Sequence, residues 1–400
     1  MSSNARLPDL PVALMSALGI LALSLFVQHE FASKQAILFL IGVGLGVVLL
    51  HAMFGFTGAW RRFTREQRSA GIRAQLLLIA LTSILFFPVL AKLVPGIHAV
   101  GAFGQVGLSV LVGAFLFGIG MQLGGGCGSG TLFTVGGGHV VMLITLAFFI
   151  VGATMGSAHL SWWLATPNLD KISIIDSLGW MPALLLQLLV LFSLYRLVMW
   201  FEKKRHGDVA TIRSDPGDTP FTERLIFGPW PLTWAVAGLA ALGMLTLLVA
   251  GHPWSITFAF GLWGAKIWAA VGGDPASWVY WSAGYPAKAL ASSVLADTTS
   301  IMNIGIILGA ILASALAGKF APAAKIQRNR VVSAVIGGLL LGYGARLAFG
   351  CNIGALLGGI SSGSLHGWLW LIAAFIGSIL GVRIRIWMKL DPPLLKSQAR

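Results

Sequence analysis

Long hydrophobic runs alternate with short polar segments along most of the chain. Ten such runs lie near residues 9–28, 36–53, 75–94, 107–123, 139–158, 178–201, 230–250, 299–318, 331–349 and 366–388. Each is close to the ~20 apolar residues that an α-helix needs to cross the hydrocarbon core of a bilayer. The pattern predicts an all-α, polytopic membrane protein with about ten transmembrane helices.

An eleventh run, at 254–271, is shorter and is interrupted by Gly261, Gly264 and Lys266. The basic residues between runs form four clusters, at 61–73, 203–205, 319–330 and 383–389. Lys and Arg concentrate on the cytoplasmic side of membrane proteins, and all four clusters share that side only if the eleventh run does not cross. We therefore expect a re-entrant segment there, an inner-membrane location and two cytoplasmic termini.

Composition agrees with the membrane as solvent. Hydrophobic residues make up 57% of the chain and charged residues 10%, against about 25% charged in soluble globular proteins. The formal net charge of +14 resides in short clusters beside apolar runs, which is typical of juxtamembrane charge. The lipid bilayer is therefore the expected partner of the basic residues, and nucleic acid is not.

Glycines interrupt one apolar run at residues 118–130, which read GIGMQLGGGCGSG. Each interior glycine costs a helix ~1 kcal/mol relative to alanine, so the backbone is expected to break here, at Cys127. The only other cysteine, Cys351, lies in GYGARLAFGCNIG. An offset of 224 residues superimposes the two stretches with nine identities in twenty positions, both cysteines included. The chain therefore contains an internal duplication with two equivalent thiols, and one disulfide between them is left open.

A second pair of similar segments predicts how the two copies are oriented. His51, Phe54, Phe56 and Trp60 resemble His252, Phe258, Phe260 and Trp263. The first segment adjoins a basic cluster and the second is expected on the outer side, which indicates inverted repeats of the kind found in secondary transporters. The predicted organisation is an additional N-terminal transmembrane helix at 1–35, a first half at 36–201, a cytoplasmic linker at 202–229 and a second half at 230–400.

The two breaks have the properties of an anion site. Irregular backbone at membrane depth is tolerated where it is buried in protein or lines a cavity. Half-helices starting near 131–135 and 355–360 would present positive dipole ends to an anion, and a polarizable thiol suits a soft species. The candidate substrate ligands at the breaks are Cys127, Cys351, Gly126, Gly350, Gly130 and Gly354. The alternatives are close helix packing by the glycines and burial of the cysteines as small hydrophobes.

Arg346 is the one charge inside a glycine-cysteine stretch, and Gln122 occupies its equivalent position in the first copy. An intramembrane charge is a functional hypothesis, so we add both residues to the candidate substrate-binding set. The alternative for Arg346 is a side chain that extends to the membrane interface, and the same two readings apply to Lys266. No cofactor or metal is expected, since soft-metal sites need several sulfur or imidazole ligands.

The stretches GIGMQLGGGCGSGT, GYGARLAFGCNIG and FGFTGAWRR resemble the paired cysteine elements and the F-C-x-T-G element of the YeeE/YedE sulfur-transport membrane proteins. The resemblance covers most of the chain from about residue 36. It implies an all-helical fold with inverted halves, and members that take up thiosulfate pass it between cysteine thiols. That role falls on Cys127 and Cys351, whereas the family's third cysteine falls on Gly55.

The sequence thus predicts a transporter and not an enzyme, namely an inner-membrane permease for a small sulfur-containing anion, with thiosulfate as the expected substrate. A soluble sulfur-carrier protein is a candidate partner. Two alternatives stay open: transport of another sulfur or selenium species, and a membrane thiol enzyme that carries sulfur as a persulfide on Cys127 or Cys351.

Overall fold

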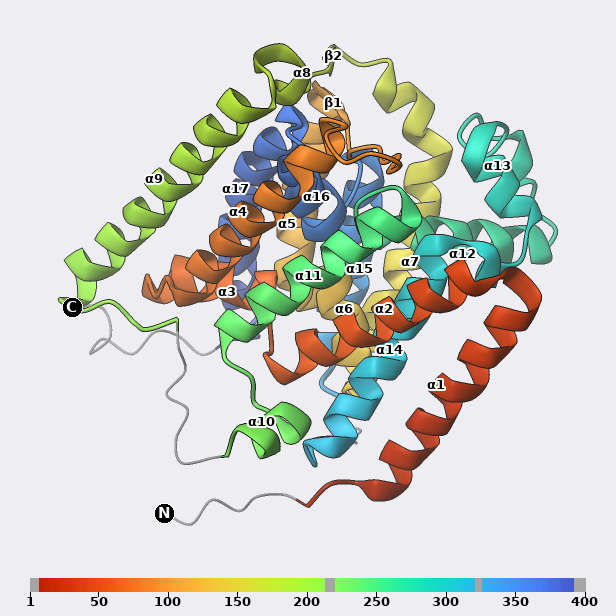
Figure 1. The fold of residues 1–400 in the computed structure, drawn as a ribbon, viewed down its shortest axis with the longest axis horizontal. Helices are drawn as coiled ribbons and strands as arrows, with labels where there is room; N and C mark the ends of the chain where they lie inside the picture. Colours follow the sequence, from red (N-terminus) through yellow and green to blue (C-terminus); the bar gives the residue numbers. More distant parts are fainter. Residues whose placement is uncertain (1–6, 213–219, 321–325, 392–400) are drawn as a thin grey trace.

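The computed structural model describes residues 7–212, 220–320 and 326–391, which fold into a helical bundle (Figure 1). From the N-terminal end, these residues form α1 Leu10–Phe31, α2 Ser33–His51, α3 Phe56–Glu66, α4 Ala70–Leu90, β1 Gln105–Gly107, α5 Leu108–Gly124, α6 Gly128–Gly136, α7 Val140–Leu164, β2 Asn168–Lys171, α8 Ile174–Leu178 and α9 Trp180–His206. They continue with α10 Phe221–Phe227, which lies within the predicted linker, and then α11 Leu232–Ala250, α12 Thr257–Ala270, η1 Pro275–Ser277, α13 Gly284–Ala291, η2 Val294–Ala296, α14 Thr298–Leu316, α15 Arg328–Leu347, η3 Asn352–Leu357, α16 Gly358–Ser361 and α17 Leu365–Trp387. The two short strands pair with each other in antiparallel orientation.

Ten helical stretches among the described residues are long and apolar enough to cross a membrane. They are Leu10–Phe31, Ser33–Glu66, Ala70–Leu90, Leu108–Gly136, Val140–Leu164, Trp180–His206, Leu232–Ala250, Thr298–Leu316, Arg328–Ser361 and Leu365–Trp387. Each overlaps one of the ten hydrophobic runs, which confirms the predicted polytopic, all-α fold. The protein is a multi-pass membrane protein.

The eleventh run forms α12, whose 14 residues span only ~21 Å at 1.5 Å per residue. That length is short of the ~30 Å hydrocarbon core, and the re-entrant path remains a prediction. Lys266 on α12 donates from Nζ to the carbonyls of Leu290 at 2.7 Å and Ser292 at 2.6 Å. Because these carbonyls end α13, Lys266 caps a helix, a contact that neither reading of this lysine had anticipated.

The two halves meet where α5 crosses α15. A methyl group on Gly344 would lie 2.4 Å from the Gly113 carbonyl oxygen, and one on Gly120 would lie 2.9 Å from that of Gly337. The two helices therefore run antiparallel in near backbone contact, as small residues allow between membrane helices. α5 also packs against α17, and α15 against α7. These glycines serve packing, as the alternative reading of the stretches anticipated, while inverted topology of the halves stays a prediction.

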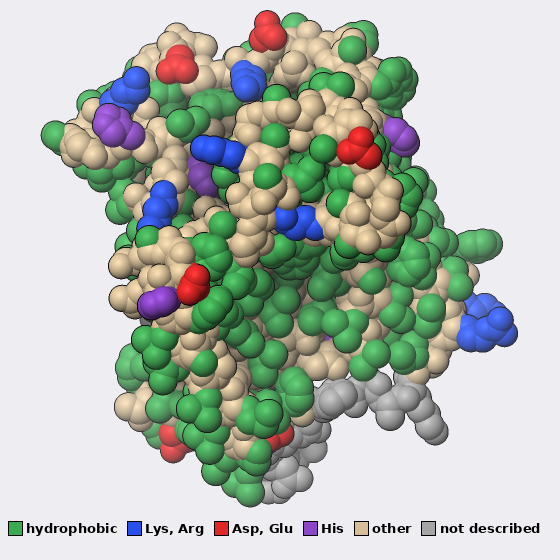
Figure 2. All heavy atoms as spheres, turned by 90° about the vertical axis from the view of Figure 1, so that its right-hand side faces the viewer, with side chains coloured by type: hydrophobic (Ala, Val, Ile, Leu, Met, Phe, Trp, Pro, Cys, Tyr) green, Lys and Arg blue, Asp and Glu red, His purple; other side chains and the backbone are tan. Residues whose placement is uncertain are grey.

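Two helices lie at the periphery and expose their apolar side chains. Only 17% of the apolar window is buried in α1 and in α9, against 67% in α4. Figure 2 shows one outer face, on which hydrophobic side chains cover most of the lower half and charged side chains gather in the upper half. Helices that are apolar on all sides need lipid around them, so α1 and α9 are the outermost helices of the bundle.

The segment between the halves is partly held by a buried carboxylate. Glu202, at the end of α9, accepts hydrogen bonds from the backbone N–H groups of Ser69 and Ala210, each at 3.1 Å. Arg68 pairs with the same carboxylate at 3.3 Å. The linker therefore leaves α9 anchored to the start of α4. Residues 213–219 of the predicted linker and 321–325 of one basic cluster lie outside the described residues, and the domain boundaries remain predictions.

Candidate functional site

Both cysteines lie in breaks between helices, as the glycine pattern predicted. The first break, 125–127, separates α5 from α6, and the second break, 348–351, separates α15 from the π-helical segment η3. We call these two segments the cysteine breaks. The half-helices begin directly after the cysteines, earlier than the expected 131 and 355. The reason is that the Cys127 carbonyl accepts from Thr131 N at 2.8 Å and that of Cys351 from Ala355 N at 2.9 Å, so each cysteine is the N-cap.

The two breaks share one backbone turn. Gly125 has φ 83° and Phe349, at the equivalent position, has φ 59°. Each following cysteine has ψ −166°. A phenylalanine in the left-handed region costs of order 1–3 kcal/mol, and such strain is concentrated at functional sites. The duplicated sequence therefore encodes similar turns at both breaks, although an α-helix follows Cys127 and a π-helix follows Cys351.

The cysteine breaks meet in the interior of the bundle. Cys127 is 1% exposed, Cys351 is 0% exposed, and both are free thiols. A methyl group on Gly128 would lie 3.0 Å from the Cys351 Sγ atom. Cys127 Sγ lies 3.4 Å from Ser129 Oγ, and the Ile353 N–H donates to Cys351 Sγ at 3.4 Å. Two residues 224 positions apart in the sequence thus contribute to one buried site.

The glycines predicted as ligands keep the breaks compact. A methyl on Gly126 would lie 3.0 Å from Thr131 N, and one on Gly350 would lie 2.8 Å from Ala355 N, so these two glycines let each turn close. Around Gly130 and Gly354 the space is less crowded. Methyl groups there would lie 3.5 Å from Cys127 Sγ and 3.3 Å from Ser255 Oγ, respectively, and both sites face polarizable or polar atoms that a ligand would also meet.

Asn352 is a polar residue of the site that the sequence reasoning missed. It directly follows Cys351, is fully buried, and neither atom of its amide group has a hydrogen-bond partner among the described residues. An unsatisfied buried polar group costs ~1–3 kcal/mol, so its retention indicates a ligand or water that satisfies it. In the duplication Asn352 is equivalent to Gly128. This replacement of a glycine by a polar amide is the sequence feature that could have identified Asn352 as a site residue.

Gln122 and Arg346 do not come together. Gln122 Nε2 donates to Ser378 Oγ at 2.8 Å and to the Thr57 carbonyl at 3.2 Å. Arg346 instead lies in an aromatic cage, where its Nη1 donates to the Tyr280 hydroxyl at 2.9 Å and its guanidinium carbon lies 4.4 Å from the centre of that ring. The two equivalent residues therefore have no hydrogen-bond partner in common, and the substrate-binding role of each stays a prediction.

The second guanidinium nitrogen of Arg346, Nη2, is buried without a hydrogen-bond partner among the described residues. It faces α12, since a methyl on Gly261 would lie 2.2 Å from it. Phe258 and Trp281 complete the cage, each with its ring centre 5.9 Å from the guanidinium carbon. The guanidinium is thus held by aromatic side chains, and both readings of Arg346, as a substrate contact and as an interfacial side chain, stay predictions.

Gly55 stands at the start of α3, and among the described residues no atom outside its own chain neighbours lies within 4 Å of a methyl group built on it. Its φ of −127° suits any side chain. The position where the resemblance places a third cysteine is therefore open space, and no neighbouring side chain fills it.

Comparison with known proteins gives relatives over most of the chain. The thiosulfate transporter TsuA of Spirochaeta thermophila is 28% identical over 361 residues, which cover 85% of this chain and 95% of the relative. The thiosulfate transporter TsuA of Escherichia coli is 26% identical over 369 residues, covering 89% and 95%. The probable transporter YedE of Escherichia coli is 32% identical over 157 residues, 38% of each chain.

A family profile described as sulphur transport matches residues 51–380. This range contains both cysteine breaks and the segment around Gly55. It begins at the end of α2, and the reading of the first helix as an addition stays a prediction. The chain therefore belongs to the sulphur transport family of membrane proteins.

Proposed function

We propose that this protein is an inner-membrane permease for a small sulfur-containing anion, with thiosulfate as the expected substrate, and that the anion passes between Cys127 and Cys351. The observation that carries the proposal is the meeting of two buried, free thiols at equivalent positions of breaks with similar backbone turns. Two relatives that cover most of the chain are named thiosulfate transporters. The relatives' names also agree with a transporter and not an enzyme.

The chemistry of the breaks suits thiosulfate in particular. A neutral thiol is a weak S–H donor, and the terminal sulfur of thiosulfate is a soft acceptor of similar polarizability. Its oxygen end can accept from stronger donors, of which the Asn352 amide is buried beside Cys351 without a partner. Neutral thiols are required, because a thiolate would repel the dianion at a distance where water screens little.

Substitution of the cysteines tests the path. Cys127→Ala and Cys351→Ala should each reduce uptake of radiolabelled thiosulfate into proteoliposomes to near the level of empty vesicles. Ser193→Ala is a matched control, since this exposed serine on α9 bonds only its own helix at the Leu189 carbonyl. Normal uptake by both alanine variants, at equal protein content, would contradict the proposal.

Arg346 belongs to the proposal as the group that draws the anion toward the path. Its unpartnered Nη2 gives it spare hydrogen-bonding capacity in a partly buried setting, where a charge interacts more strongly than in water. Arg346→Gln should lower uptake several-fold and Arg346→Lys should recover part of the loss. Unchanged uptake by Arg346→Gln at low substrate concentration would assign the arginine to packing against Tyr280.

The direction of insertion completes the proposal. The basic clusters predict that both termini are cytoplasmic, and release on that side would deliver sulfur to a soluble carrier protein. A cysteine-bearing tag is fused to either end of the chain, and its labelling by an impermeant thiol reagent is compared in intact cells and in inverted vesicles. Labelling of either tag in intact cells would reverse the predicted orientation.

A further inference from the structure

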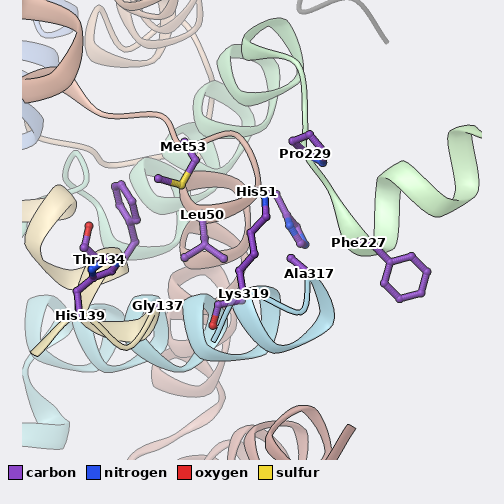
Figure 3. Close-up of a pocket in the computed structure, with 12 residues that line it drawn as sticks. Leu50, His51, Met53, Thr134, Gly137, His139, Phe227, Pro229, Ala317 and Lys319 are labelled. Carbon is purple, nitrogen blue, oxygen red and sulfur yellow. The ribbon is translucent and has the colours of Figure 1, made fainter. Parts of the chain in front are cut away.

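A cavity of about 130 Å³ lies at the C-terminal end of α6 (Figure 3). Cys127 lies at the opposite end of this helix. Its walls come from the last residues of α2 and α14, from the last turn of α6 and from the segment after α10. His51, at the end of α2, is buried, whereas Lys319 and His139 are exposed at the rim. The cavity therefore opens toward the end of the molecule that the basic clusters place in the cytoplasm.

Basic and soft groups line this cavity, and none of its 12 lining residues is acidic. Figure 3 shows the Lys319 side chain extending from the end of α14 toward His51. Lys319 takes part in no ion pair among the described residues. The Thr134 hydroxyl and the Met53 thioether add a hydrogen-bonding group and a polarizable sulfur. These are the groups that would hold a small soft anion.

The cavity is connected by structure to the cysteine breaks. α6 starts next to Cys127 and its last turn supplies Thr134 to the cavity wall. Its nine residues correspond to ~13 Å at 1.5 Å per residue. Met53 belongs to the loop that continues through Gly55 into α3. An anion that left the cysteine breaks along α6 would reach this cavity next.

The second half has a counterpart that lacks these properties. A pocket of about 10 Å³ lies between α11, α4 and the segment after Cys351, the elements that correspond to α2, α14 and α6. Its lining includes Trp254, Phe86 and Leu357 and contains no charged residue. Lys319 follows α14, and its backbone N–H donates to the carbonyl of Ser314, five positions earlier. Leu93 takes the same place after α4, where its N–H donates to the carbonyl of Pro88. The loop after α4 does carry a lysine, Lys92, but this residue does not line the smaller pocket, so only the first cavity has a charged wall.

We propose that the cavity lined by His51, Met53, Thr134, His139 and Lys319 is a second anion-binding site, a vestibule that holds the sulfur-containing anion between the cysteine breaks and the predicted cytoplasm. This inference rests on the proposed function for the identity of the anion. The ammonium of Lys319 attracts the anion from the rim, and His51 and Thr134 form the inner wall.

Equilibrium binding of radiolabelled thiosulfate to the full chain in lipid nanodiscs tests the vestibule. The Cys127→Ala/Cys351→Ala double variant, which lacks the central thiols, should still bind. In this double variant, Lys319→Gln should raise the thiosulfate concentration needed for half-saturation at least five-fold. Lys319→Arg in its place should return that concentration to the value of the double variant. Lys204→Gln removes an equal charge near the same predicted side but away from the cavity, where Lys204 lies over Trp200, and should change nothing.

Each outcome separates the vestibule from the transport proposal, because uptake by the parent chain is measured in parallel in proteoliposomes. No binding by the double variant, or binding that is equal with and without Lys319→Gln, overturns the vestibule even when the parent transports. If the parent chain takes up no thiosulfate but still binds it in a Lys319-dependent manner, only the permease proposal is overturned. Lys319 is exposed, so its substitution is not expected to impair folding.

Discussion

At the residue scale, the spacing between the cysteine breaks depends on Gly128. A side chain there would meet the Cys351 Sγ atom at 3.0 Å and the Ile256 Cγ2 atom at 3.3 Å. Contacts this short force neighbours to move, and overpacking of this kind typically costs ~1–3 kcal/mol. The absence of a side chain at one residue therefore sets how closely the two thiols approach.

Gly128→Ala should consequently lower thiosulfate uptake several-fold by displacing the second thiol. Gly19→Ala in the peripheral helix α1 is the control, since no atom is found within 4 Å of a methyl built there among the described residues. Uptake per folded protein in proteoliposomes distinguishes the two variants. Equal uptake by both would mean that the breaks tolerate a shift of this size.

Asn352 allows stability and transport to be separated. If its buried amide exists to meet a ligand, Asn352→Leu removes an unsatisfied group and should leave the thermal midpoint unchanged or raise it, since such a group costs ~1–3 kcal/mol. The same variant should lose most thiosulfate uptake. Thermal unfolding and uptake of one preparation check both parts, and full uptake by Asn352→Leu would reduce the amide to a packing role.

At the element scale, the crossing of α5 and α15 depends on glycines that bring the two backbones together. Gly344 has no room for a side chain, because the Gly113 carbonyl oxygen lies 2.4 Å from the place of its methyl. Backbone atoms in packed helices cannot move independently, so the clash must be relieved by separating the helices. The cysteine breaks follow directly from these two helices and would separate with them.

Gly344→Ala should therefore reduce the yield of folded protein and lower its thermal midpoint. Gly19→Ala in the peripheral helix α1 is the control, because nothing lies within 4 Å of its methyl and alanine favours a helix over glycine by ~1 kcal/mol. Monodispersity in size-exclusion chromatography and the thermal midpoint report the difference. A fully folded Gly344→Ala protein would show that the crossing can widen.

At the scale of the whole molecule, an ion cluster ties the end of α17 to the centre. Arg385 donates to both oxygens of Asp391 at 2.8 Å and, from Nη1, to the Gln122 carbonyl at 2.6 Å. Arg65 on α3 also pairs with Asp391, at 3.4 Å. Three segments that are remote in sequence are therefore held together at the predicted cytoplasmic end.

The pH dependence of this cluster follows from the carboxylate. Hydrogen bonds from Arg385 hold the pKa of Asp391 below its ordinary value, so its contribution to stability is present above the unfolded pKa of about 3.9 and is lost as pH falls through the folded pKa. Asp391→Asn should lower the thermal midpoint at pH 7, and the gap to the parent should close as pH falls below about 4. A gap that stays constant between pH 7 and pH 3 would contradict this assignment.

The sequence by itself determined the ten membrane spans and the two cysteine breaks. Run length and glycine spacing are local properties, and they act within one helix at a time. The duplication at an offset of 224 residues could also be recognised in the sequence, because neighbouring residues encode the turn that Gly125 and Phe349 share. The start of each half-helix was misplaced by a few residues, since a cysteine is not a usual N-cap.

Only the tertiary structure decided what individual residues in these stretches contact. Gly113 and Gly128 look alike in the sequence, yet one meets a carbonyl of α15 and the other meets Cys351. Likewise Arg346 is enclosed by aromatic rings that lie 65 to 88 positions away, and Lys319 faces a cavity whose walls include the ends of α2 and α6, far away in the sequence. These partners depend on how helices cross, which is set by the packing of all of them together and by no single stretch of sequence.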